Sequence, residues 1–167
     1  MQLRQRIEEL NGLVFIDWDF DFSPNLKPDL GTYLDNVNVA TQIAMGMQIP
    51  IVNIPGGSPE QLGLLGIHEP KYSKILELWQ SYDGYKNFGP QGIYFPSKII
   101  EHLSDKIHIP NKELVLGYGG IRGADCVMNF AQLTCIMING EKTYAIPEIL
   151  GCEPAKKGYI ILELVRD

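Results

Sequence analysis

The stretch that decides the fold runs from Leu13 to Pro24 and reads LVFIDWDFDFSP. Its first four residues are apolar and lead directly into Asp17, a pattern typical of a buried strand in a parallel sheet. Asp17 is therefore predicted at the carboxyl end of a strand, the edge at which open α/β sheets bind their ligands. Asp19 and Asp21 add carboxylates at alternate positions. Close carboxylates in a partly apolar cleft suit acid or base chemistry, and they also serve as polar caps of a turn.

Composition narrows the class of protein. With 167 residues, we expect one domain, 1–167, that buries a core without metal or disulfide staples. The net charge of -6, with no basic run longer than Lys156 and Lys157, argues against a nucleic-acid surface. No apolar stretch approaches the roughly 20 residues of a membrane helix, and the N-terminus lacks the apolar core of a signal peptide. Three cysteines without CxxC spacing indicate reduced thiols, hence a cytoplasmic location.

The order of predicted elements indicates a βαβ unit. A helix over 2–10 precedes the first strand, and a Pro-containing loop over 23–31 follows it. The apolar spacing then predicts a helix over 32–48 and a strand over 49–54, followed by helices over 71–82 and 96–103 with a loop over 83–92 between them. We expect a three-layer αβα fold with a mostly parallel, Rossmann-like sheet.

A second group of residues suggests a catalytic cysteine. A strand over 113–116 leads into a Gly-rich turn over 117–125, and a helix is predicted to begin at Cys126; strands over 143–146 and 159–165 close the sheet. The free N–H groups and the positive end of the dipole at a helix N-terminus favour a thiolate. If the strands are parallel, Asp17 and Cys126 leave the same edge, which places a base beside a nucleophile. The alternative is that Cys126 is a small buried apolar residue.

These residues resemble the isochorismatase-like cysteine hydrolases, a family that includes the nicotinamidases. The first motif of that family is matched by Asp17, Asp21, Phe22, Ser23 and Pro24, with Phe20 in place of the usual Asn. The second motif, a strand followed by a Gly and then Cys-Val opening a helix with Ala nearby, is matched by Gly117, Cys126, Val127 and Ala131. The resemblance implies an isochorismatase-like domain over the whole chain.

The resemblance also implies residue roles. Asp17 would be the general base and Cys126 the nucleophile, with the backbone N–H groups of Asp125 and Cys126 as an oxyanion hole. Lys86 is the best match to the third residue of the family, and Lys98 is the alternative.

The same resemblance indicates the chemical class of the substrate. It implies hydrolysis of a small amide, or of a related C–N or vinyl-ether bond, by a homo-oligomer. The aromatic side chains expected to shape the pocket are Trp18, Phe22, Tyr85 and Tyr118, and all four also suit a core. The Asp-x-His of nicotinamidases is absent after the second strand, where Asn53 is followed by Ile-Pro-Gly-Gly. We therefore expect no metal and no cofactor.

Two other functions fit parts of the sequence. Asp17, Trp18 and Asp19 after an apolar strand also look like the first motif of haloacid-dehalogenase-type phosphatases, which bind Mg²⁺. That family requires Thr or Val where this chain has Asp21. A non-catalytic binding or scaffold protein on the same fold is the third possibility, because a fold does not fix a function.

Overall fold

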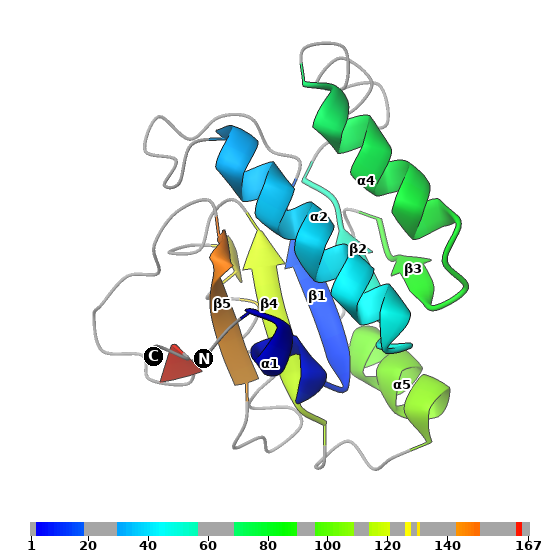
Figure 1. Ribbon diagram of the computed structural model, residues 1–167. Helices are drawn as coiled ribbons and strands as arrows, with labels where there is room; N and C mark the ends of the chain where they lie inside the picture. Colours follow the sequence, from blue (N-terminus) through cyan, green and yellow to red (C-terminus); the bar gives the residue numbers. More distant parts are fainter. Residues whose placement is uncertain are drawn as a thin grey trace.

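The computed structural model describes residues 3–18, 30–56, 69–89, 96–108, 114–120, 126–127, 130, 143–150 and 163–164. Within these ranges the chain forms a six-stranded sheet in the order β3-β2-β1-β4-β5-β6 (Figure 1). The strands are β1 (Gly12–Ile16), β2 (Ile51–Ile54), β3 (Tyr85–Asn87), β4 (Leu116–Gly120), β5 (Thr143–Leu150) and β6 (Glu163–Leu164). Every neighbouring pair is parallel. The predicted α/β fold with a parallel sheet is confirmed.

Strand β1 lies at the centre of this sheet. Its residues pair with β2 on one side, Leu13 opposite Ile51, and with β4 on the other, Leu13 opposite Gly117. All five residues of β1 are buried. A strand that is covered on both faces has a continuous run of apolar residues, so this strand could be predicted from the sequence.

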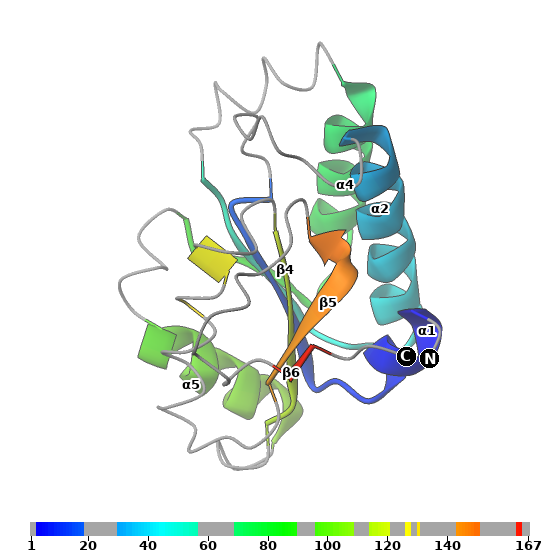
Figure 2. The same cartoon turned by 90° about the vertical axis from the view of Figure 1, so that its left-hand side faces the viewer.

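Helices pack on both faces of the sheet. The helices α1 (Leu3–Glu8), α2 (Leu30–Gly46) and α4 (Pro70–Gln80) lie on one face, and α5 (Pro96–Ile107) lies on the other (Figure 2). Alternate residues of β1 enter the two cores, with Leu13 and Phe15 on the α2 and α4 side. Val14 and Ile16 face α5. The helix expected from Cys126 falls mostly on residues outside the described ranges, so the complete three-layer arrangement stays a prediction.

Several predicted boundaries were wrong. The loop predicted over 83–92 contains β3, a three-residue strand with two exposed residues, and short polar edge strands resemble loops in composition. Strand β4 covers 116–120 rather than 113–116, so the first part of the predicted Gly-rich turn is buried strand. Strand β2 begins at Ile51, after Pro50, whose ring nitrogen has no hydrogen to donate to a sheet.

Helix boundaries were closer to expectation. Glu69 caps α4 by accepting a hydrogen bond from the Lys71 backbone N–H, and Pro70 follows at the first helical position. Helix α5 extends to Ile107, one turn beyond the predicted end. The apolar spacing alone does not resolve the last turn of a helix.

The end of β4 approaches the end of β1 unusually closely. Gly120 has a φ of +150°, and a Cβ atom placed there would collide with the Ile16 carbonyl oxygen. The same Cβ position lies 2.9 Å from Cγ2 of Val127. Only glycine fits, because it tolerates this backbone conformation and has no side chain to displace these atoms.

We predict opposite outcomes for one substitution at two glycines. Gly120→Ala should lower the free energy of unfolding by about 2 to 4 kcal/mol through steric collision and backbone strain. Gly46→Ala should raise it by roughly 0.5 kcal/mol, because nothing lies within 4 Å of its Cβ position and Ala has the higher helix propensity. Urea unfolding of the two variants and the parent chain measures both. Equal effects at the two sites would contradict the close approach.

Candidate functional site

The strand order identifies the edge where a ligand site is expected. The chain builds β1, β2 and β3 outward in one direction and then returns to the other side of β1 with β4. In parallel α/β sheets this reversal opens a crevice outside the carboxyl ends of the two central strands. The arrowheads of β1 and β4 in Figure 1 mark that edge. Asp17 directly follows β1, and Cys126 lies six residues beyond β4.

The close approach at Gly120 also brings Asp17 and Cys126 toward each other. The Ile16 carbonyl carbon is 3.0 Å from the Gly120 Cβ position, and Val127 Cγ2 is 2.9 Å from it. Asp17 and Cys126 are the sequence neighbours of these two residues. Standard covalent dimensions then limit the separation of their Cα atoms to roughly 15 Å. The two predicted catalytic residues therefore lie at one edge of the sheet.

Cys126 is not part of a disulfide, and it lies partly buried in a wide helical turn shared with Val127. Its side chain packs against the apolar cluster on the α5 face of the sheet, in which Val127 and Phe130 are buried. Turns of this wider kind occur frequently at functional sites. The residue is partly exposed, as reactive cysteines usually are.

Asp17 turns the chain away from the sheet. Its φ of +50° is left-handed, a conformation that Asp adopts more readily than most residues. Its backbone N–H donates to the Ile54 carbonyl oxygen at 2.9 Å, which extends the pairing of β1 with β2 by one bond. The residue is partly buried. The strand therefore ends before Asp17, and Asp17 lies at the edge formed by the carboxyl ends of the strands.

Lys86 lies well away from Asp17. It is exposed on the edge strand β3, in line with Val52 of β2 and Val14 of β1. That register is two strands away from Asp17 and three residues short of it, a separation of roughly 14 Å. The Lys86 ammonium nitrogen lies 5.9 Å from the centre of the Phe88 ring. Lys98, the alternative, is exposed in the first turn of α5.

The predicted pocket residues have different surroundings. Trp18 and Tyr118 are fully buried, in the cores on opposite faces of the sheet, whereas Tyr85 is partly buried and stacks on Trp79 with ring centres 5.6 Å apart. Phe22 and Asp125 lie outside the described residues. Trp18 and Tyr118 thus contribute to packing beneath the edge.

The buried polar atoms of the described core that have no hydrogen-bond partner include one from β2 and one that follows β1. These two are Oδ1 of Asn53 and Nε1 of Trp18, both fully buried, and the Asn53 amide nitrogen donates to the Tyr85 hydroxyl at 3.3 Å. Buried polar atoms are nearly always paired, so such exceptions call for an explanation in binding or chemistry. Asn53 was not predicted as a functional residue, although an Asn inside the apolar run IVNI was a visible signal.

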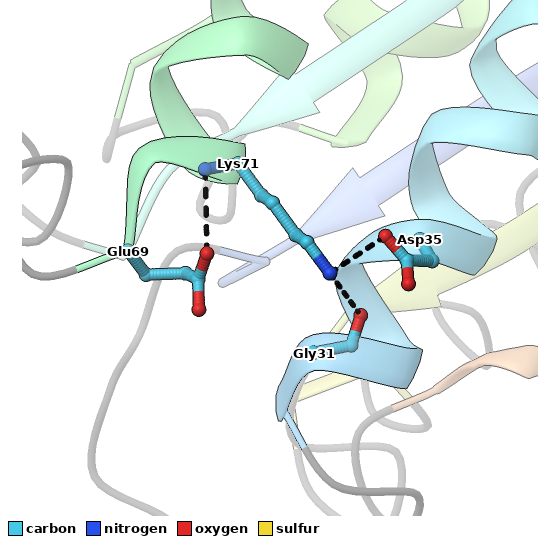
Figure 3. A network of polar contacts seen from close by, with 4 residues as sticks. All are labelled: Gly31, Asp35, Glu69 and Lys71. Carbon is cyan, nitrogen blue, oxygen red and sulfur yellow. Dashed lines mark hydrogen bonds and ion pairs between the residues drawn. The ribbon is translucent and has the colours of Figure 1, made fainter.

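An ion pair joins the first turns of α2 and α4. The Lys71 ammonium lies 2.8 Å from a carboxylate oxygen of Asp35 and 3.5 Å from the Gly31 carbonyl oxygen (Figure 3). Both ionised side chains are about half exposed, so the pair contributes at most about 1 kcal/mol. Its position matters more than its energy, because it holds together the two helices that follow β1 and β2.

No group of three or more His, Cys, Asp or Glu side chains among the described residues is arranged to hold a metal ion. In that part of the chain, no helix combines the length and apolar composition needed to cross a membrane. Comparison with protein-family models, with curated proteins and with solved structures found no match.

The two tryptophans allow a matched test of the unpaired indole. Nε1 of Trp79 donates to the Thr41 hydroxyl at 2.9 Å, and the Trp18 ring lies only 4.5 Å away, centre to centre. Both Trp→Phe changes remove the same atoms, but only Trp79→Phe breaks a buried hydrogen bond. It should therefore cost about 1 to 3 kcal/mol more than Trp18→Phe in urea unfolding. Equal losses would show that the Trp18 N–H is satisfied.

The environment of Lys86 is testable through His102. Partial burial, then the positive charges of Lys86 and Lys106, lower the pKa of His102, and Asp105 opposes them. Since the folded pKa is below the unfolded one, stability falls as pH drops from about 6.5 toward the folded value. Lys86→Gln should raise the pKa of His102 and shrink this loss, as measured by NMR titration of the imidazole. Lys74→Gln, on α4, is the control; equal shifts in both variants would contradict the placement.

Proposed function

We propose that this protein is a metal-independent cysteine hydrolase of the isochorismatase-like type, acting on a small amide or a related C–N or vinyl-ether bond. Asp17 is the general base, Cys126 the nucleophile, and Lys86 or Lys98 the positively charged third residue. The protein is proposed to work in the cytoplasm as a homo-oligomer.

The observation that carries the proposal is the convergence of Ile16, Gly120 and Val127 at the reversal between β1 and β4. It supports the proposal because it sets a carboxylate and a partly exposed thiol at the edge where parallel sheets bind ligands. Covalent hydrolysis requires such a base to come within hydrogen-bond reach of the nucleophile, which a Cα separation of at most roughly 15 Å permits.

For an amide, the proposed reaction has two halves. Asp17 takes the proton of the Cys126 thiol, and the thiolate attacks the carbonyl carbon. The backbone N–H groups of Asp125 and Cys126 stabilise the oxyanion. The proton then passes from Asp17 to the leaving nitrogen as the C–N bond breaks, which leaves a thioester. Asp17 next deprotonates a water molecule that attacks the thioester, and the acid product and the free thiol are released.

Cysteine alkylation across pH tests this proposal directly. Cys126 should react with iodoacetamide at a lower pH than an ordinary thiol, whose pKa is about 8.5, because the thiolate is the reacting form. Cys135 and Cys152 in the same chain are internal controls, resolved by peptide mass spectrometry. Asp17→Asn should shift the Cys126 profile, and so should one of Lys86→Ala and Lys98→Ala, which identifies the third residue.

Two results would overturn the proposal. A Cys126 profile equal to that of Cys135 would leave a binding or scaffold role. Phosphatase activity that requires Mg²⁺ and survives Cys126→Ala would instead favour the haloacid-dehalogenase reading, in which Asp17 is the nucleophile. A positive alkylation result justifies a screen of small neutral amides for hydrolysis, with Cys126→Ala as the inactive reference.

A further inference from the structure

The residue that follows Asp17 is fixed through both its ring and its backbone. Trp18 is fully buried, and its indole packs on the ring of Trp79, with centres 4.5 Å apart, and on that of Tyr72, at 5.3 Å. The Trp18 carbonyl oxygen accepts a hydrogen bond from the Tyr33 hydroxyl at 3.2 Å. Tyr33 is also fully buried and belongs to the first turn of α2. Trp18 is therefore held by α2 and α4, the helices that follow β1 and β2.

The bond from Tyr33 bears on the conformation of Asp17. At a φ of +50°, the backbone of Asp17 is less favourable than extended backbone, and such conformations persist where the surroundings hold them. On the N-terminal side, the Asp17 N–H donates to the Ile54 carbonyl oxygen at 2.9 Å. On the C-terminal side, the Tyr33 hydroxyl donates to Trp18. Because these two bonds bracket the turn, loss of the second one frees Asp17 to relax toward extended backbone, which moves its carboxylate.

The helix end that carries Tyr33 is itself anchored. The Lys71 ammonium of α4 lies 2.8 Å from a carboxylate oxygen of Asp35 and 3.5 Å from the Gly31 carbonyl oxygen, and these two residues flank Tyr33 in the sequence (Figure 3). The hydroxyl is thus presented by a helical turn that is tied to a second helix. Since its bond to Trp18 is buried, solvent does not replace the donor once the hydroxyl is removed.

We infer that Tyr33 is a positioning residue for the Asp17 carboxylate. Its hydroxyl holds Trp18 and thereby fixes the turn that carries the carboxylate, so Tyr33 acts through Trp18 and not on the reacting atoms. The role of Asp17 as a base rests on the proposed function, whereas the effect of Tyr33 on the turn does not.

Hydrogen exchange followed by NMR tests the effect on the turn without any reaction. Tyr33→Phe removes only the hydroxyl, and it should speed exchange of the Asp17 amide by roughly tenfold relative to that of Leu13, near the start of β1. Tyr82→Phe is the matched control, because the Tyr82 hydroxyl also donates to a backbone carbonyl oxygen, that of Ile49, at 2.9 Å. It should not raise this ratio. Equal ratios in the two variants would overturn the inference.

The pH profile of Cys126 alkylation tests the consequence for the site. Tyr33→Phe should move the midpoint in the same direction as Asp17→Asn, by about 0.5 of a pH unit. In the Asp17→Asn background it should add nothing, because no carboxylate is left to position.

The same profiles separate failure of the inference from failure of the proposed function. If Asp17→Asn moves the midpoint and Tyr33→Phe does not, the inference is wrong and the proposed function stands. Equal effects of Tyr33→Phe with and without the Asp17 carboxylate would also overturn the inference. A midpoint that Asp17→Asn leaves unchanged would overturn the proposed function, and with it the role of Tyr33 in catalysis.

Discussion

The parallel pairing of β1 with β2 on one side and β4 on the other is the constraint on which the rest of the structure depends. Because successive side chains of a strand point to opposite faces, β1 contributes Leu13 and Phe15 to one core and Val14 and Ile16 to the other. Strand β1 also joins the two halves of the sheet, because β2 and β3 lie on one side of it and β4, β5 and β6 on the other. Loss of β1 would therefore remove both cores and the expected ligand edge together.

The strand order of the sheet reverses between β1 and β4, and the close approach of the chain there requires a glycine at position 120. The proposed site lies at the same place. The backbone at the ends of β1 and β4 and the side chain of Val127 meet where a further side chain would not fit. Conformations of this kind are costly and persist where the surrounding fold holds them, frequently at functional sites. The same close approach limits the Cα separation of Asp17 and Cys126 to roughly 15 Å, so the proposed site depends on the packing that Gly120 permits.

Parts of the fold were predictable because they reflect burial. The apolar run at β1 and the helical spacing in α2 gave the parallel α/β class, since periodicity records which faces are covered. Strand β3 was missed because its residues Tyr85 to Asn87 are mostly exposed, and β4 was misplaced because Gly117, Gly119 and Gly120 read as a turn. The placement of Asp17 and Cys126 at the same edge of the sheet was predicted from the parallel topology. The unpaired Asn53 oxygen did not, because hydrogen-bond partners come from elements distant in sequence.

The charges at the ligand edge bear on what the proposed hydrolase would accept. Among the described residues, Asp17 at the end of β1 and Asp35 and Glu69 near the starts of α2 and α4 carry three negative charges, whereas the cations nearest the helix starts are Lys71, which is paired with Asp35, and Lys98 in the first turn of α5. An anionic substrate would approach this surface against a net negative potential, and the overall charge of -6 adds to the repulsion. A neutral amide meets no such barrier, and its carbonyl oxygen can accept from backbone N–H groups. Electrostatics at this edge would therefore favour uncharged amides over carboxylates as substrates of the proposed hydrolase.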